Sequence, residues 1–181
     1  MSYCAKFAQV ETVYYFTMGS PFGPLTICCS GKGVLRVETG KAFRPGVGRP
    51  NGRRSTPFRW LESKEKTRRV AAELAEYFAG RRKKFTVPLD LRGTAFQQKV
   101  WEALLSIPYG ETRSYADIAR QIGHLRAFRA VGMANHWNPI CILVPCHRVV
   151  ATGGALGGYG GGLRMKKFLL DLERGARSSR R

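Results

Sequence analysis

The hydrophobic pattern of this chain changes its period about halfway along its 181 residues. Between residues 10 and 38, short apolar segments (VYYF, LTICC and VLRV) are separated by the turn-forming stretches SPFG and SGKG. This alternation predicts a small antiparallel sheet. Beyond residue 90 the apolar residues recur at helical spacing instead. The pattern therefore predicts an α+β protein with a sheet unit at residues 1–90, a helical unit at 91–175 and a basic tail at 176–181.

A helix and a long loop complete the predicted first unit. The apolar side chains between Glu65 and Phe78 recur at helical spacing, and Gly80 follows where a helix commonly ends. Residues 40–59 are basic and rich in turn-forming residues. We expect this stretch to be an exposed loop that is either mobile or in contact with DNA.

Two capping boxes mark helix starts in the second half. Thr94 with Gln97, and Ser114 with Asp117, have the spacing at which the first side chain caps the helix and the second bonds back to it. Gly123 then separates the second of these helices from a third. Two short helices joined at a glycine predict a helix-turn-helix, although an ordinary helical hairpin in a core has the same pattern.

The third of these helices, predicted over residues 126–136, has small side chains beside two arginines. Ala127 and Ala130 lie next to Arg126 and Arg129 in the sequence. Small residues permit close approach, either of a DNA groove into which an arginine reaches or of another protein segment. The pattern alone leaves both interpretations open.

Basic residues outnumber acidic ones throughout the chain, and the formal net charge is +19. Residues 1–90 contain 17 basic and 7 acidic side chains, and residues 91–181 contain 14 and 5. An excess spread over both halves favours a polyanionic partner such as nucleic acid, because binding releases condensed counterions. A charged, solvated surface is the alternative.

The chain lacks an apolar run long enough to cross a membrane and does not begin like a signal peptide, so we expect a cytoplasmic protein. Its cysteines form an odd set without a C-x2-C pair, which argues against a disulfide framework: Cys4, Cys28, Cys29, Cys141 and Cys146. The histidines lie far along the chain from the first three cysteines, so no structural metal site is expected. A disulfide from Cys4 to Cys28 or Cys29 remains open.

The segment CILVPCHRVV, residues 141–150, contains the best candidate for a nucleophile. Pro145 interrupts strand pairing, so a break at this point would turn Cys146 toward a cavity. His147 could accept the thiol proton, through that break or through a water molecule, if a carboxylate orients its ring. The carboxylates available in this half are Glu111, Asp117, Asp171 and Glu173. An inert buried thiol beside a structural histidine is the alternative.

From Gly93 onward the chain resembles the O6-alkylguanine-DNA alkyltransferase family. Four blocks carry the resemblance in the family's order and spacing: FQQKVWEALLSIPYGETRSYADIA, RAVGMANHWNP, ILVPCHRVV and GGYGGGLRMKKFLLDLE. The resemblance implies a ribonuclease-H-like sheet domain followed by a domain of the winged helix-turn-helix kind. It implies a suicide reaction in which an alkyl group passes from O6 of a flipped-out guanine to the protein's own cysteine.

The resemblance also assigns roles to individual residues. Cys146 becomes the alkyl acceptor, connected through water to His147, which Glu173 orients. Asn138 braces the turn before the active-site segment, and Tyr115 assists base flipping and donates toward N3 of guanine. The carbonyls of Cys146 and Val149 accept the guanine amino group, while Tyr159 and the Gly160 amide line the alkyl side. The residues implied to face DNA are the arginine finger Arg129 with Ser114, Arg126, Ala127 and Ala130.

Gly160 departs from many relatives, which carry a side chain such as serine at this position. The departure removes a hydroxyl and widens the pocket, which favours larger alkyl groups. No cofactor is implied: the glycine-rich stretch at 153–162 has neither the phosphate-loop nor the dinucleotide-binding pattern. The expected partner is double-stranded DNA with O6-alkylguanine, bound by a monomer, and O4-alkylthymine stays open as a second substrate.

Three other functions fit parts of the pattern. An alkyltransferase-like lesion sensor would have tryptophan in place of Cys146. A winged-helix regulator would need DNA-binding helices but not Cys146, His147 and Glu173 together. A cysteine hydrolase would turn over repeatedly and commonly has its cysteine at a helix start.

Overall fold

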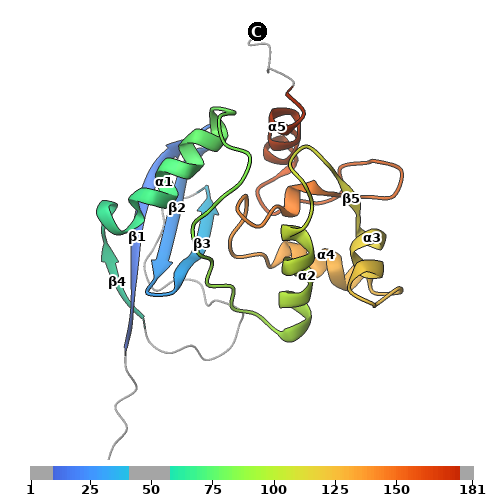
Figure 1. Ribbon diagram of the computed structural model, residues 1–181, viewed down its shortest axis with the longest axis horizontal. Coiled ribbons are helices and arrows are strands. Elements are labelled where there is room, and N and C mark those ends of the chain that lie inside the picture. The colour runs from blue at the N-terminus through green and yellow to red at the C-terminus, as the bar shows by residue number, and fades with distance from the viewer. Residues whose placement is uncertain (1–9, 41–57, 176–181) are drawn as a thin grey trace, which may run out of the picture.

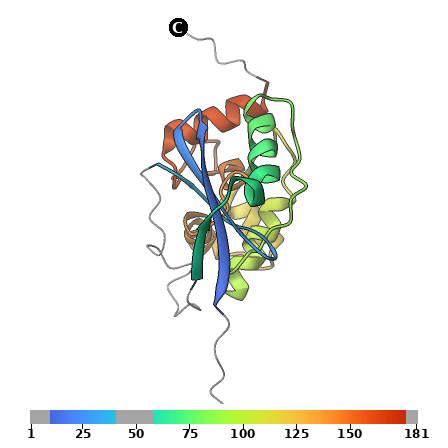
Figure 2. The same ribbon diagram turned by 90° about the vertical axis from the view of Figure 1, so that its left-hand side faces the viewer.

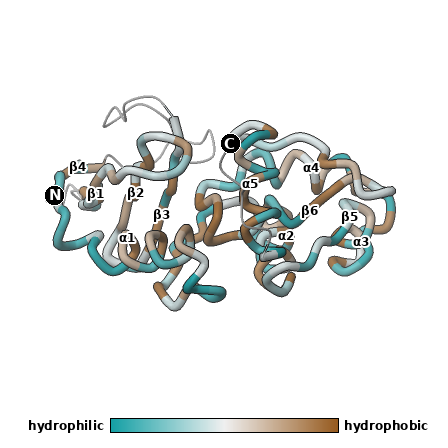
Figure 3. The backbone as a smooth tube through the Cα atoms, turned by 90° about the horizontal axis from the view of Figure 1, so that it is seen from above, coloured by the Kyte–Doolittle hydropathy of each residue, from teal (hydrophilic) through white to brown (hydrophobic). Residues whose placement is uncertain are grey.

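The computed structural model describes residues 10–40 and 58–175, which form two units side by side (Figures 1 and 3). The sheet unit holds four strands in the order β3-β2-β1-β4. They are β1 (Glu11–Ser20), β2 (Gly23–Ser30), β3 (Gly33–Thr39) and β4 (Phe58–Glu62). The first three pair antiparallel, which confirms the sheet predicted for residues 10–38.

Strand β4 corrects one boundary of the prediction. The loop was expected to continue to residue 59, but Phe58 begins a strand that pairs parallel to β1 from Glu11 onward. Phe58 and Trp60 pack against the buried cluster of Val13 and its neighbours on the sheet. The strand was missed because its pairing partner lies almost fifty residues earlier in the chain. The rest of the predicted loop, residues 41–57, lies outside the described residues, as does the basic tail at 176–181.

Helix α1 (Lys64–Phe78) lies against the sheet (Figure 2). Ser63 caps it by accepting a hydrogen bond from the Lys66 amide, and Gly80 follows its end with a φ of 73°. The buried face of α1 includes Leu74 and Tyr77, both without exposed surface. The helix predicted from Glu65 to Phe78 is therefore confirmed.

The helical unit contains four helices among its described residues: α2 (Ala95–Leu105), α3 (Tyr115–Gln121), α4 (Phe128–His136) and α5 (Leu163–Glu173). Both predicted capping boxes are present, at Thr94 and at Ser114. Helix α4 begins at Phe128, two residues later than predicted, because the backbone of Ala127, the residue before it, is not helical. Two short parallel strands, β5 (Arg113–Ser114) and β6 (Val149–Val150), complete the unit.

A buried tryptophan connects the helices of this unit. Trp101 has no exposed surface, and its Nε1 donates to the Ala134 carbonyl at 2.9 Å, which ties α2 to α4. No helix in the described ranges is long and apolar enough to cross a membrane.

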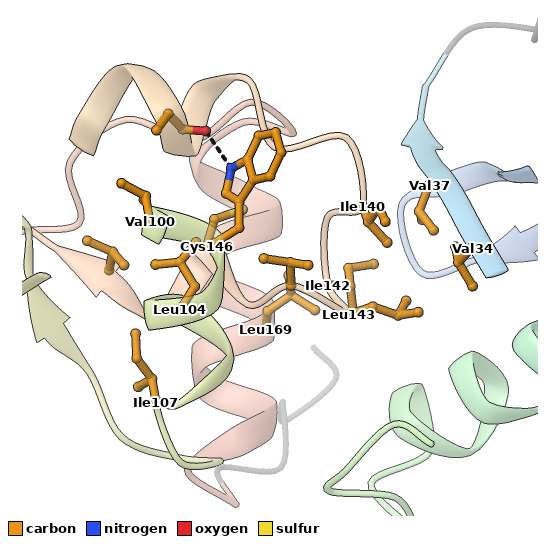
Figure 4. Packing of buried hydrophobic residues seen from close by; sticks show 14 of the residues in the cluster. Val34, Val37, Val100, Leu104, Ile107, Ile140, Ile142, Leu143, Cys146 and Leu169 are labelled. Carbon is orange, nitrogen blue, oxygen red and sulfur yellow. Dashed lines mark hydrogen bonds between the residues drawn. The ribbon is translucent and has the colours of Figure 1, made fainter. Parts of the chain in front are cut away.

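The edge strand β3 joins the two units. The Val37 amide donates to the Pro139 carbonyl of the helical unit at 2.9 Å, and the Val34 amide donates to the Pro88 carbonyl, in the segment that leads to that unit, at 2.8 Å. Figure 4 shows the packing at this junction, where Val34 and Val37 face Ile140 and Leu143. Because one hydrophobic core runs through both units, the boundary set at residue 90 stays a prediction.

The close approach at β3 generates a prediction about Gly33. A Cβ at this position would lie 2.4 Å from the Pro88 carbonyl oxygen, and the φ of Gly33 is 147°. We expect Gly33→Ala to lower the free energy of unfolding by about 2 kcal/mol, measured by urea denaturation. Gly31→Ala is the matched control, since a Cβ at Gly31 meets nothing within 4 Å. Equal stability of the two variants would contradict the proposed strain.

Candidate active site

A braced turn leads into the active-site segment. Asn138 donates from Nδ2 to the Val144 carbonyl at 2.9 Å and accepts from the Ile140 amide at 3.0 Å, so its side chain spans the turn. Within this turn Ile142 has a φ of 75°, unusual for a β-branched residue and the one non-glycine case of positive φ in the described ranges. The Asn138 amide thus holds a strained backbone in place.

The backbone changes direction at Pro145 as predicted, but the residues just before Pro145 form a turn and not the expected strand. Pro145 is followed by a short 3-10 turn, η2 (Cys146–Arg148), and then by the strand β6. The turn leaves Cys146 only 6% exposed and His147 fully buried. Figure 4 shows Cys146 beside the core residues Val100 and Leu104. Cys146 therefore lies in the interior of the protein and not on its surface.

His147 and Glu173 meet in the buried interior of the helical unit. His147 Nε2 lies 2.8 Å from Glu173 Oε1. The other ring nitrogen, Nδ1, is buried and has no hydrogen-bond partner among the described residues. Burial lowers the pKa of His147, and the neighbouring Glu173 only partly opposes this effect. A neutral imidazole with its proton on Nε2 follows, which leaves the Nδ1 lone pair available.

Glu173 accepts several hydrogen bonds at once. Arg148 donates to both carboxylate oxygens, each at 2.9 Å, and the Gly110 amide and the Tyr77 hydroxyl donate at 3.0 and 2.6 Å. Burial by itself would raise the pKa of Glu173, but hydrogen bonds from His147 and Arg148 lower it to about 2. The carboxylate is therefore ionised at neutral pH, with the buried Arg148 guanidinium as its counter-charge.

The Cys146 thiol is neutral in this setting. Burial raises its pKa, although the Asn138 side chain and the positive charge of Lys166 act in the opposite direction. Lys166 is fully buried and donates to the carbonyls of Val149, at 2.6 Å, Leu156 and Gly158. Burial lowers the pKa of Lys166 to about 8. A cation thus ties the loop before α5 to β6 close to the thiol.

A pocket of about 410 Å³ opens onto Cys146. Four of its lining residues belong to the predicted site: Tyr115, Cys146, Tyr159 and Gly160. Four others were not predicted: Gly132, Asn135, His136 and Gly158. Val149, which was also predicted, is not among the lining residues, and its carbonyl accepts from Lys166. The pocket is large enough for a purine base.

Four of the predicted DNA-facing residues lie at the start of α4 or just before it, and Ser114 lies at the start of α3. Arg126, Arg129 and Ala130 are exposed, and Ala127 is half-buried. The hydroxyl of Ser114 is engaged in its capping box, where it donates to Asp117 at 2.8 Å. Sequence reasoning missed the exposed apolar side chains of the same region, Leu125, Phe128, Met133 and Trp137.

Three buried polar residues of the site were also missed. Arg148 directly follows the Cys-His pair, and this adjacency was a usable signal. Lys166 looks like part of a solvated basic run, and Tyr77 looks like an ordinary core residue of α1. Only the fold brings Lys166 and Tyr77 to the site.

The remaining thiols differ from Cys146 in their surroundings. Burial raises the pKa of Cys28 to about 12 and of Cys29 to about 11, and neither is bonded to another cysteine of the described ranges. The disulfide considered for them involves Cys4, which lies outside the described residues. Cys141 donates to the Val37 carbonyl at 3.1 Å and has no histidine beside it in the sequence. The described part of the chain contains no cluster of His, Cys, Asp and Glu that could hold a metal ion.

Acid should unfold the protein through Glu173. Because the folded-state pKa is lowered from its usual 4.5 to about 2, the stabilisation is complete above 4.5 and is lost as the pH falls toward 2. In Glu173→Gln the buried Arg148 loses its counter-charge, so we expect the free energy of unfolding at pH 7 to fall by about 3 kcal/mol. Urea denaturation between pH 7 and pH 2 measures both effects.

The variant should also lose the acid dependence that Glu173 contributes. Glu76→Gln, which removes a partly buried ion pair with Arg82, is the matched control and should retain this acid dependence. An acid dependence in Glu173→Gln equal to that of the wild type would contradict this role of the carboxylate.

Comparison with known proteins identifies the family. Residues 13–91 match the model "6-O-methylguanine DNA methyltransferase, ribonuclease-like domain", and residues 95–175 match "6-O-methylguanine DNA methyltransferase, DNA binding domain". A methylated-DNA--protein-cysteine methyltransferase of Mycolicibacterium paratuberculosis is 56% identical over 90% of this chain and 93% of its own. One of Methanosarcina barkeri is 44% identical over 89% and 97%.

Solved structures agree with these sequence matches. The crystal structure of Mycobacterium tuberculosis OGT in complex with DNA is 44% identical, with a TM-score of 0.80 over 92% of this chain and 96% of that one. These matches confirm the predicted α+β class, with a sheet domain before a helical domain. The chain belongs to the 6-O-methylguanine DNA methyltransferase family.

Proposed function

We propose that this protein repairs DNA by moving a methyl or larger alkyl group from O6 of guanine onto Cys146. The observation that carries the proposal is the pocket that ends on the Cys146 thiol, with a neutral, oriented imidazole in the next residue. Membership of the methyltransferase family supports the same chemistry. Since a thioether is not reversed by any group in the pocket, each chain acts once.

His147 and Glu173 activate the thiol in this proposal. The free lone pair of His147 Nδ1 accepts the Cys146 proton through a water molecule, and Nε2 keeps its own proton toward Glu173. The sulfur forms a bond to the alkyl carbon as the bond from that carbon to O6 breaks. The electrons of the broken bond pass to the purine ring, which takes up the proton released from the thiol.

Pocket residues stabilise the departing guanine. The Tyr115 hydroxyl is half-buried at the pocket, and burial raises its pKa, so it stays protonated and donates toward N3. The Gly160 amide lies on the alkyl side with Tyr159, while the Cys146 carbonyl accepts the amino group; the Val149 carbonyl, implied for the same role, already accepts from Lys166. Gly160 adds no Cβ and nothing lies within 4 Å of that position, which leaves room for alkyl groups larger than methyl.

Helix α4 places the protein on double-stranded DNA. The exposed Arg129 fills the gap left by the extruded base, and Arg126 with Ser114, Ala127 and Ala130 lies against the backbone and groove. The net charge of +19 supports an electrostatic contribution. The pocket and its acceptor thiol lie within one chain, so we propose that the protein acts as a monomer, in the reducing cytoplasm where thiols persist.

The alternatives account for less of the site. A lesion sensor with tryptophan at the acceptor position does not describe a chain with Cys146 there. A winged-helix regulator has no use for a buried cysteine, histidine and glutamate at one pocket.

The stoichiometry of transfer tests the proposal. We expect excess O6-methylguanine duplex to add one methyl group per chain, at Cys146, because the thioether has no route back to a thiol. Intact mass and peptide mapping measure this, and Cys146→Ser should remain unmodified. Turnover beyond one equivalent, or a methyl group on Cys141, would refute the single-use mechanism.

Arg129→Ala tests the finger. Only duplex substrate must be opened, so we expect transfer from duplex DNA to slow by about 10-fold or more while transfer from free O6-alkylguanine base is unchanged. Single-turnover rates on both substrates measure this. Arg69→Ala, which removes an exposed charge from α1, is the control. Equal losses on both substrates would contradict the assignment.

A further inference from the structure

Tyr77 belongs to α1 in the sheet unit, and its hydroxyl reaches His147 and Glu173 in the helical unit. This hydroxyl donates to Glu173 Oε1 at 2.6 Å and lies 3.4 Å from His147 Nε2. The side chain has no exposed surface. Seventy residues separate Tyr77 from His147, so the contact exists only because the two units pack together.

The surrounding rings fix the position of this hydroxyl. Phe85 and Tyr109 lie 5.2 and 6.2 Å from the Tyr77 ring between centroids, and Phe78 lies at 5.9 Å. Burial and the adjacent Glu173 charge raise the pKa of Tyr77 far above its usual value. The hydroxyl therefore stays protonated and acts as a donor to the carboxylate.

Glu173 Oε1 is the atom on which the arrangement converges. It accepts from Tyr77, lies 2.8 Å from His147 Nε2, and accepts from Arg148 at 2.9 Å. The donor from Tyr77 takes up part of the carboxylate charge and restricts the movement of Oε1. Both effects act on His147, because the position and charge of Oε1 set the orientation of the ring and its affinity for a second proton.

We propose that Tyr77 is a positioning residue for alkyl transfer: its hydroxyl holds Glu173 so that His147 stays neutral and aimed at Cys146. The inference rests on the proposed function. It makes the sheet unit part of the active site and not merely its support. A helical unit without α1 would contain the acceptor cysteine and its histidine but would lack this donor.

The test compares two tyrosine-to-phenylalanine variants. Tyr77→Phe removes the hydroxyl and keeps the ring, and we expect the single-turnover rate on O6-methylguanine duplex to fall about 10-fold. Tyr109→Phe is the matched control: its ring contacts Tyr77, but its hydroxyl donates to the Leu172 carbonyl at 3.4 Å and not to Glu173. We expect this variant to react at the wild-type rate.

The pH profile of the rate separates positioning from packing. Without the Tyr77 donor, Glu173 presents more negative charge to His147 and raises its pKa, so the acid limb of the profile should move to higher pH. The other charged groups facing His147, Arg148 and Lys166, are unchanged in the variant. Placing 3-fluorotyrosine at position 77 strengthens the donor without removing the ring, so the acid limb should move to lower pH.

Several outcomes would overturn the proposal. They are a wild-type rate in Tyr77→Phe, equal losses in both phenylalanine variants, or an acid limb that moves in neither substituted protein. If Tyr77→Phe does not fold, the test rests on the 3-fluorotyrosine protein alone. An acid limb that stays at its wild-type pH in that protein would then refute the positioning role of Tyr77. Failure of the wild type to transfer the methyl group to Cys146 would instead refute the proposed function.

Discussion

The buried carboxylate of Glu173 is the interaction on which the rest of the site depends. It accepts from the Gly110 amide, from the Tyr77 side chain in α1, and from the side chains of His147 and Arg148 in η2. Three separate segments therefore meet at this carboxylate. A buried charge is tolerated only when its hydrogen-bonding capacity is used and a counter-charge is near. Arg148 supplies that charge, and the Ile107 carbonyl accepts a further hydrogen bond from Arg148 at 2.6 Å. The cluster therefore locks the end of α5 to the turn that carries Cys146.

Burial, which the hydrogen bonds of this cluster must offset, also keeps the Cys146 thiol in its unreactive protonated form. It raises the pKa of Cys146 and lowers that of His147, so neither group is charged before a substrate arrives. A neutral pair suits a reaction that each molecule performs once, because an exposed thiolate would be consumed by other electrophiles or oxidants. Lys166 and Asn138 favour the thiolate without exposing it. The two side chains that favour the thiolate also bind backbone carbonyls around it: Asn138 donates to Val144, and Lys166 donates to carbonyls of β6 and the loop before α5.

The two units act as one body around this site. Strand β3 is paired with the segments at Pro88 and Pro139, and the second of these pairings lies at the start of the braced turn. Helix α1 delivers Tyr77 to the other end of the site. The strained Ile142 backbone is held between them by Asn138. A continuous core across both units explains why such a strained turn persists.

Sequence alone determined the local features of this protein, because they depend on neighbours a few residues apart. The three antiparallel strands, α1, both capping boxes and the change of backbone direction at Pro145 were predicted, as were Cys146 and His147 and the choice of family. Tertiary structure decided what depends on distant partners. Strand β4 exists through its pairing with β1. The residues alone did not show which of the four carboxylates of this half orients His147. The packing of α5 against η2 brings Glu173 to the ring. Lys166 and Tyr77 resemble a surface lysine and a core tyrosine in sequence, and only burial beside carbonyls and a carboxylate turns them into parts of the site.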